Sequence, residues 1–337
     1  MYEKLMWDME NEILDLIIKN IKSGNMESAT WLTSKLKEQS MISNQTNVII
    51  KKYIPKITNS INDDVSNEIK KVYLNTLKDL NITNVDYGAF KTVLEQYSST
   101  LINSFNITSA GLIQNAPNVF IESANKASVL LSSGTVSSDK AMSMLVKDWT
   151  NKGIPAIVDK GGRTWNSYTY ASNILRTTNR NITTDVQTKT FDEYDIDLVE
   201  ISSHSGARPS CEPYQGKIYS RSGKSKKFPP LSSTSIGEIA GLLGINCGHT
   251  MYPYIEGTKK TYDTYPKKEN DEIYKESQKQ RYLENSIRKS KQELNLAQKA
   301  GLDVAPYKKA VSDKQAKMRE FIKDTGRTRY YAKERLL

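Results

Sequence analysis

The stretch Asp197-Leu198-Val199-Glu200-Ile201-Ser202 decides the fold class, because it is the clearest strand signal in a chain otherwise patterned for helices. Apolar and polar side chains largely alternate along it, with the two-residue period of a β-strand. Weaker strand signals follow at residues 217–220 and 250–255. These three short segments predict a small antiparallel sheet inside a central α+β region.

Helical periodicity surrounds this region. In the first helix, apolar residues recur every four positions, at Leu5, Met9, Ile13, Ile17 and Ile21. This spacing forms one face of an α-helix, and it continues in further segments to about residue 149. One of these helices is predicted to kink or end at Pro55, because proline lacks the backbone N–H and clashes with the preceding turn. Residues 167–191 predict one long helix.

The segment after Pro266 also predicts helices, two of them joined by a short loop. A highly charged helix stops at Ala300-Gly301, and a second restarts near Pro306, a residue favoured in the first helical turn. We expect an αα-hairpin that projects from the core. The chain is therefore predicted to be a predominantly helical α+β protein.

Length and composition divide the chain into regions. Its 337 residues exceed what one compact core usually organises. A hydrophobic content of 37% and a mean hydropathy of −0.59 indicate helical arms around a modest core. We predict a helical N-terminal region over residues 1–150, a central α+β domain over 151–257, and a basic helical hairpin with a tail over 258–337.

The net charge of +10 is concentrated at the C-terminal end. Residues 258–337 contain 21 Lys and Arg against 12 Asp and Glu, a net charge of +9, whereas the preceding 257 residues carry +1. A basic helical segment fits an acidic partner, either nucleic acid or an acidic protein surface. The alternative is a solvated helical surface without such a partner.

The sequence predicts no membrane contact. No stretch approaches the apolar length of a transmembrane helix, and acidic residues occur throughout the first 19 residues, unlike in a signal peptide. We therefore expect a protein that is made and kept in a cytoplasm. Only two cysteines in a reducing compartment argue against a disulfide framework.

Both histidines and both cysteines of the chain lie in one short segment: His204, Cys211, Cys247 and His249. Two Cys and two His match the ligand set of a closed tetrahedral zinc site. Cys247 and His249 would face the same side of a strand, and Gly248 lets the backbone bend between them. His204 and Cys211 flank a loop that could fold both toward one point. A structural Zn²⁺ held by these four residues is one prediction.

Two other interpretations stay open for these residues. Cys211 could be a thiol nucleophile with His204 or His249 as its base, as in a cysteine hydrolase. The four residues could instead be buried groups that pack and hydrogen-bond, since neither pair has the C-x2-C spacing of a zinc knuckle. The sequence has no carboxylate pair, phosphate-binding glycine loop or H-E-x-x-H motif, so we predict no enzyme activity.

The central and C-terminal regions carry a series of motifs in a fixed order. These motifs are Gly161-Gly162-Arg163-Thr164-Trp165, Tyr170-Ala171-Ser172-Asn173-Ile174-Leu175-Arg176-Thr177, residues 197–211, residues 214–220, Gly244-Ile245-Asn246-Cys247-Gly248-His249, residues 277–284 and 287–289, and Phe321-Ile322 with Thr325-Gly326. With this order and spacing, residues 152–337 resemble the phage minor capsid 2 family, which is related to the MuF-type head morphogenesis proteins. The first 150 residues match only in being helical. Gly248 departs from the family pattern, which has a basic residue there.

The resemblance implies a low-copy structural protein of a tailed-bacteriophage head, assembled in the host bacterial cytoplasm. Its implied place in the virion is the portal vertex or the inner capsid face, where it would assist head assembly or DNA packaging. The implied partners are the portal protein and the major capsid protein. Packaged double-stranded DNA, and further copies of the chain in a homo-oligomer or ring at the portal, are additional candidates.

Two other functions stay open. One is a DNA-binding internal head protein that is ejected with the genome, which the basic C-terminal region would suit. The other is a zinc- or thiol-dependent hydrolase built on the Cys/His cluster. Phosphate contacts would favour the first, and an open metal position or a cleft at Cys211 would favour the second.

Overall fold

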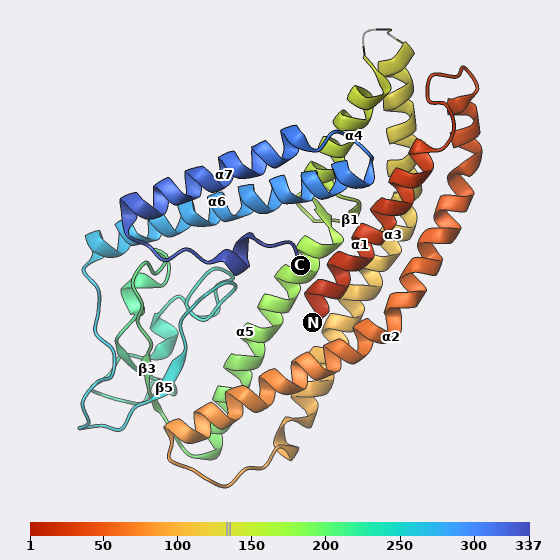
Figure 1. Ribbon diagram of the computed structural model, residues 1–337. Helices are drawn as coiled ribbons and strands as arrows, with labels where there is room; N and C mark the ends of the chain where they lie inside the picture. Colours follow the sequence, from red (N-terminus) through yellow and green to blue (C-terminus); the bar gives the residue numbers. More distant parts are fainter. Residues whose placement is uncertain (133, 135) are drawn as a thin grey trace. The chain divides into compact units, whose positions relative to one another are not determined.

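The structure, a computed structural model, describes residues 1–132, 134 and 136–337. These described residues form seven α-helices and five short strands, which confirms the predicted helical α+β class (Figure 1). The helices are α1 (Tyr2–Lys22), α2 (Trp31–Asp79), α3 (Lys91–Ser132), α4 (Ser138–Lys152), α5 (Ser167–Glu193), α6 (Lys267–Lys299) and α7 (Ala305–Thr325). The strands are β1 (Pro155–Val158), β2 (Thr164–Asn166), β3 (Leu198–Ile201), β4 (Ile218–Ser220) and β5 (Met251–Pro253).

The strands form two small antiparallel sheets within the described part of the chain. β1 pairs with β2, and a second sheet has the order β4-β3-β5. Val199 in the central strand β3 lies opposite Tyr219 of β4 on one side and Pro253 of β5 on the other. All three strands of this sheet fall within the segments that the sequence predicts, at residues 197–202, 217–220 and 250–255.

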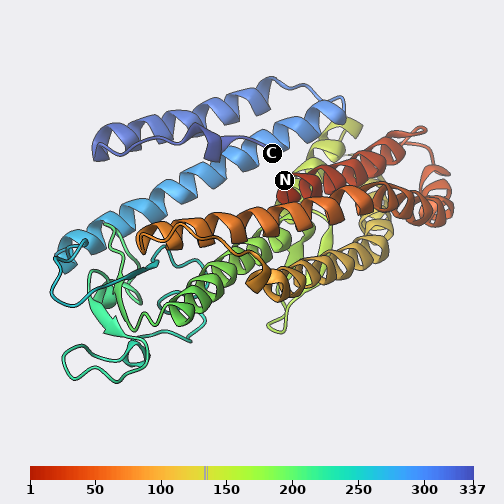
Figure 2. The same ribbon diagram turned by 90° about the horizontal axis from the view of Figure 1, so that it is seen from below.

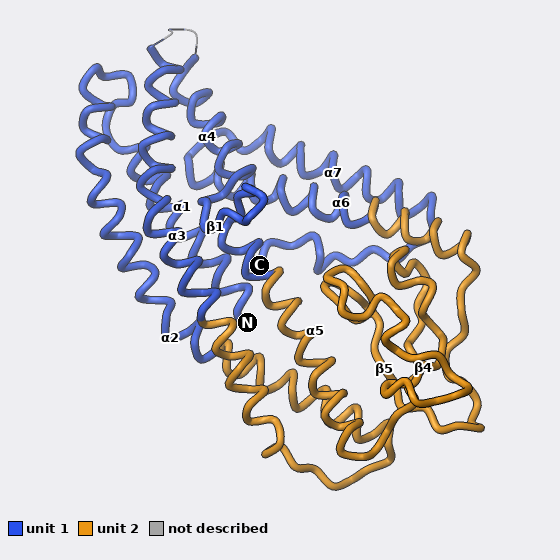
Figure 3. Tube along the Cα trace, turned by 180° about the vertical axis from the view of Figure 1, so that it is seen from behind, with its two compact units in different colours: residues 1–59, 103–172, 280–337 blue, residues 60–102, 173–279 orange. Residues whose placement is uncertain are grey.

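The chain divides into two compact units, each assembled from separate parts of the sequence (Figure 3). Unit 1 contains residues 1–59, 103–172 and 280–337, and unit 2 contains residues 60–102 and 173–279. Helices α2, α3, α5 and α6 each contribute residues to both units. The three regions predicted from composition describe changes along the sequence and stay a prediction, and the boundaries of the compact units do not follow them.

In unit 1 the predicted apolar face of α1 is buried. Met9, Ile13 and Ile17 are all 0% exposed. Figure 2 shows α6 and α7 side by side as the C-terminal hairpin. Between them lies a seam of Leu283, Ile287, Met318, Phe321 and Ile322.

The hairpin does not project freely, which corrects the expectation from sequence. Within unit 1, Gln292 Nε2 of α6 donates to Asn11 Oδ1 of α1 at 2.8 Å. Lys299 Nζ donates to an Asp15 carboxylate oxygen of α1 at 2.6 Å. The polar faces of α1 and α6 therefore hold the hairpin against the rest of this unit.

The helix that contains Pro55 does not end there, because α2 continues to Asp79. Apolar residues keep helical spacing on both sides of the proline, and Ile50, Ile57 and Ile61 are buried. A proline inside a helix costs about 3 kcal/mol. Burial of the flanking apolar side chains offsets that cost, since tertiary packing supplies most helical stability in proteins.

Glu10 of α1 accepts hydrogen bonds at the start of α5, within unit 1. Ser167 Oγ lies 2.6 Å and Tyr168 N lies 3.1 Å from its Oε2, and Ile154 N lies 3.3 Å from its Oε1. The residue is only 5% exposed, and this burial raises the pKa of its carboxyl above the usual value. The carboxylate supplies an acceptor for N–H groups that have no partner inside the helix.

Replacing Glu10 with Ala is expected to lower the free energy of unfolding by about 2–4 kcal/mol, because two backbone N–H groups and one hydroxyl lose their buried acceptor. Chemical denaturation of the full-length chain measures the change. Glu95→Ala, at an exposed position of α3, is the control and should leave stability almost unchanged. Equal stability of the two variants would contradict this role of Glu10.

Candidate metal centre

The pairing of the three-stranded sheet determines where the Cys and His residues meet. Because β4 and β5 both run antiparallel to β3, the end of β3 and the starts of β4 and β5 lie at one edge of the sheet. Ser202 N donates to Thr250 O there at 2.9 Å, and Gly216 N donates to Ile201 O at 2.9 Å. The loop after β3 and the loop before β5 therefore lie together, and both lie in unit 2.

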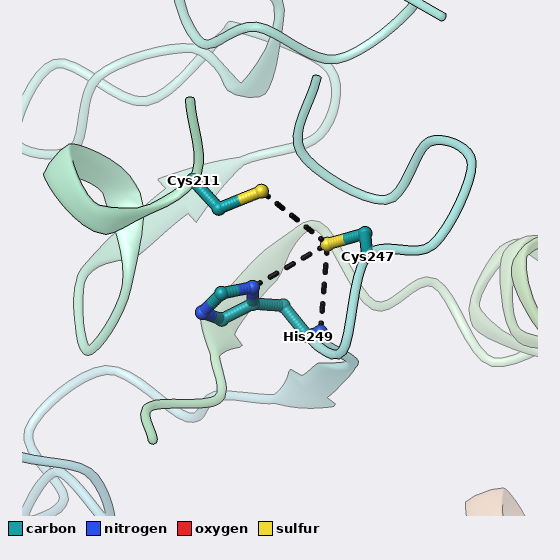
Figure 4. A group of neighbouring side chains, drawn as sticks. All are labelled: Cys211, Cys247 and His249. Atoms are coloured by element: carbon teal, nitrogen blue, oxygen red, sulfur yellow. Dashed lines mark hydrogen bonds between the residues drawn. The ribbon is translucent and has the colours of Figure 1, made fainter. Parts of the chain in front are cut away.

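Three of the four predicted ligands share one centre at this edge (Figure 4). Cys211 Sγ is 3.6 Å from Cys247 Sγ, and Cys247 Sγ is 3.4 Å from His249 Nδ1. These three atoms all lie within 4.8 Å of one another. Cys211 and His249 are each 1% exposed, Cys247 is partly buried, and neither cysteine forms a disulfide.

His204 lies beside this group rather than inside it. Its ring stacks on the ring of His249, with centroids 4.5 Å apart and planes inclined by 27°. Its Nδ1 is 3.3 Å from the carbonyl oxygen of Ser205. Its Nε2 is buried and has no hydrogen-bond partner among the residues that the structure describes. Burial lowers the pKa of this imidazole below its usual value.

Backbone N–H groups on both sides of Cys247 in the sequence are directed at its sulfur. Leu243 N lies 3.2 Å and His249 N lies 3.5 Å from Cys247 Sγ. Leu243 and Asn246 both have a φ of 58°, in the left-handed region. Asparagine tolerates this region, but a bulky residue such as leucine is strained there. The loop therefore keeps a strained conformation that surrounds Cys247 with donors.

Arg208 connects the two loops. Its NH2 and NH1 atoms donate to the carbonyl oxygens of Gly241 and Ile245, both at 2.7 Å, and its Nε lies 3.2 Å from Cys211 Sγ. These contacts are to two backbone carbonyls and a sulfur, so Arg208 acts as a positioning residue for the centre.

Two residues of the site carry no individual signal in the sequence. Gln215 Oε1 lies 3.1 Å from His249 Nε2 and accepts the backbone N–H of His204 at 3.1 Å. Arg180 of α5 donates through its NH2 to the carbonyl oxygen of His249. Gln215 lies in the motif at residues 214–220, but nothing in that motif indicates its contact with His249, and nothing distinguishes Arg180 from other polar residues of its helix.

The pKa values of the two thiols are shifted in opposite directions. The hydrogen bond from Cys211 lowers the pKa of Cys247, which His249 lowers further, whereas the same bond and burial raise the pKa of Cys211. A nucleophilic thiol needs access and a lowered pKa. Cys211 has neither, so the geometry gives no support to its role as the nucleophile of a hydrolase. Two sulfurs and an imidazole nitrogen around one point can instead bind a soft divalent cation.

Replacing Arg208 with Met is expected to lower the free energy of unfolding by about 2–3 kcal/mol, because charge-assisted hydrogen bonds to two loop carbonyls are lost. Denaturation of the full-length chain measures the loss. The control is Arg281→Met at an exposed position of α6. A loss of the same size in both variants would show that Arg208 does not hold the loops.

Comparison with known proteins gives the class and the family. The family described as Phage minor capsid protein 2 matches residues 3–323. A structural protein of Lactococcus phage LL-H is 29% identical over 333 residues, which cover 91% of this chain and 89% of that protein. A structural protein of Lactococcus phage mv4 is 36% identical over 117 residues, which cover 33% of this chain and 93% of that protein. No solved structure matches.

These matches define a structural protein of a bacteriophage particle. The chain belongs to the phage minor capsid protein 2 family. The resemblance drawn from motifs is thereby confirmed, and its extent is corrected: the match begins at residue 3, so the N-terminal region shares more with the family than helical character. Within the described residues, no helix combines the length and the apolar character needed to cross a membrane.

Proposed function

We propose that the protein is a low-copy, non-enzymatic component of a tailed-bacteriophage head that acts in head assembly and DNA packaging. Its proposed place is the portal vertex or the inner capsid face, with the portal protein and the major capsid protein as partners. The observation that carries this proposal is the family match over residues 3–323. The predominantly helical architecture of the described residues fits a structural role.

The exposed charges of α7 support contact with an acidic partner. Basic side chains on this helix are exposed at Lys308, Lys309, Lys317, Arg319 and Lys323. Exposed acids on the same helix are fewer, at Asp313, Glu320 and Asp324. Lysine and arginine that displace counterions give binding that weakens as salt rises. Packaged DNA or an acidic surface of the portal or capsid protein would suit this helix.

Phage that lack this protein are expected to produce heads that are absent, misassembled, poorly filled or non-infectious. Electron microscopy, particle DNA content and plaque counts measure these effects, with expression of the chain from a plasmid as the rescue control. Unchanged particle number, DNA content and infectivity would rule out the assembly role.

The location of the protein separates the proposal from an internal protein ejected with the genome. We expect particles that have released their DNA to retain the chain. Disappearance of the chain together with the DNA would favour the ejected protein instead. Immunoblots of full and emptied particles make this comparison.

Neutralising the five exposed basic residues of α7 with Gln should weaken binding of the full-length chain to its acidic partner and flatten the salt dependence. Each lost phosphate contact lowers the slope of log K against log salt by about 1. The matched control carries five Gln substitutions at exposed lysines of other helices, namely Lys37, Lys51, Lys70, Lys91 and Lys147. Binding to DNA, portal protein and capsid protein is measured for each variant. Equal slopes of log K against log salt for the two variants would indicate that α7 is a solvated surface without an acidic partner.

A further inference from the structure

We propose that Cys211, Cys247, His249 and His204 bind one structural Zn²⁺ in unit 2. The inference goes beyond the role in head assembly and does not depend on it. It rests on the geometry of the donor atoms, on the hydrogen bonds that orient them, and on one buried nitrogen that has no hydrogen-bond partner in the described part of the chain.

The distances between donor atoms match the edges of a zinc tetrahedron. With Zn–S bonds of about 2.3 Å and Zn–N bonds of about 2.0–2.1 Å, two sulfurs lie about 3.8 Å apart, and a sulfur and a nitrogen about 3.5 Å. The observed separations are 3.6 Å between Cys211 Sγ and Cys247 Sγ and 3.4 Å between Cys247 Sγ and His249 Nδ1. The third separation, between Cys211 Sγ and the His249 nitrogen, is at most 4.8 Å, and shortening it to about 3.5 Å would bring all three donors onto one ion.

Gln215 presents the correct nitrogen of His249 to the ion. Its side-chain atom 3.1 Å from His249 Nε2 also accepts the backbone N–H of His204, so that atom is an oxygen. An amide oxygen only accepts, and His249 Nε2 must therefore carry the proton. The lone pair of His249 is then on Nδ1, which faces the sulfurs. A hydrogen bond of this kind from the second ring nitrogen orients most histidine ligands of metals.

The sulfurs have the hydrogen-bond donors that bound thiolates need. Leu243 N and His249 N approach Cys247 Sγ, and Arg208 Nε approaches Cys211 Sγ at 3.2 Å. Donors directed at sulfur favour its negative form, in which cysteine binds metal. The strained Leu243 keeps one of these donors in place.

His204 supplies the fourth ligand. Its Nε2 is buried without a hydrogen-bond partner among the described residues, and a buried polar atom in that state is costly. Ligation removes this cost, and the ring already lies against His249, with the two centroids 4.5 Å apart. A Cβ at Gly248 would lie 3.0 Å from this Nε2, so glycine leaves the nitrogen room to turn toward the ion. Four protein ligands make a closed structural site with no open position.

The ion would join two loops that have little regular structure. The residues between β4 and β5 form only the short 3₁₀ turn Leu231–Ser233. The ion would bind the folded arrangement of this loop and the loop after β3 and not the unfolded chain, so its binding free energy would add to the stability of the fold. The metal would therefore stabilise the part of unit 2 that the three short strands alone hold weakly.

Elemental analysis of the full-length chain, purified under reducing conditions, tests the proposal. We expect about one zinc per chain, and a fall in Tm when a chelator removes it. Cobalt substituted for zinc should give the visible absorption of a tetrahedral site and a sulfur-to-cobalt charge-transfer band. The proposal would be overturned if the purified protein contained no zinc and its Tm did not change when zinc or a chelator was added. These measurements need no substitution, so a variant that fails to fold does not affect them.

Variants assign the ligands. Cys211→Ser, Cys247→Ser and His249→Gln should abolish the cobalt spectrum, whereas Ser205→Ala, an exposed neighbour of His204, is the control and should keep it. Gln215→Met should weaken zinc binding about 10–100-fold in a chelator competition, with the cobalt spectrum kept, because it removes only the orienting hydrogen bond. Zinc affinity unchanged by His204→Gln would exclude His204 as the fourth ligand.

Discussion

Antiparallel pairing on both sides of β3 is the constraint on which the arrangement of unit 2 depends. One strand with two antiparallel neighbours brings the end of β3 and the starts of β4 and β5 to the same edge. The strand is buried on both faces: Val199 and Ile201 are 0% exposed, and Glu200 between them is 2% exposed. Glu200 is tolerated there because the backbone N–H groups of Thr261 and Tyr262 donate to its carboxylate at 2.9 and 2.7 Å.

The same use of buried polar groups recurs in both units. Glu10 in unit 1 and Glu200 in unit 2 each accept backbone N–H groups from a segment distant in sequence. Arg208 does the reverse, donating to two carbonyls of a loop. A chain with 37% hydrophobic residues has limited apolar surface to bury, so hydrogen bonds to backbone groups position its loops. Removing one partner of such a bond is destabilising, because the other partner is left in the interior without a hydrogen bond.

Periodicity predicted the elements of this fold well, since spacing of apolar residues is a local property. The strand at residues 198–201, the long α5 and the two C-terminal helices follow from it directly. The continuation of α2 past Pro55 and the docking of α6 on α1 do not, because both depend on packing between distant segments. Composition singled out the four Cys and His residues. The stacking of His204 on His249 is not visible in the sequence, because it is set by how the loops fold.

The two properties proposed for this chain, metal binding and contact with an acidic partner, involve residues that differ in burial. Cys211 and His249 are almost fully buried, and Cys211 belongs to a core that includes Phe191, Val199 and Met251. The proposed closed metal site would therefore act on stability and offer no surface chemistry. The basic residues of α7 are exposed and belong to unit 1, where they are suited to contact with other molecules. A structural protein needs both properties, a fold that persists and a surface that binds. Because different residues supply the two properties, loss of the metal would lower the stability of the fold without removing the exposed charges that contact a partner.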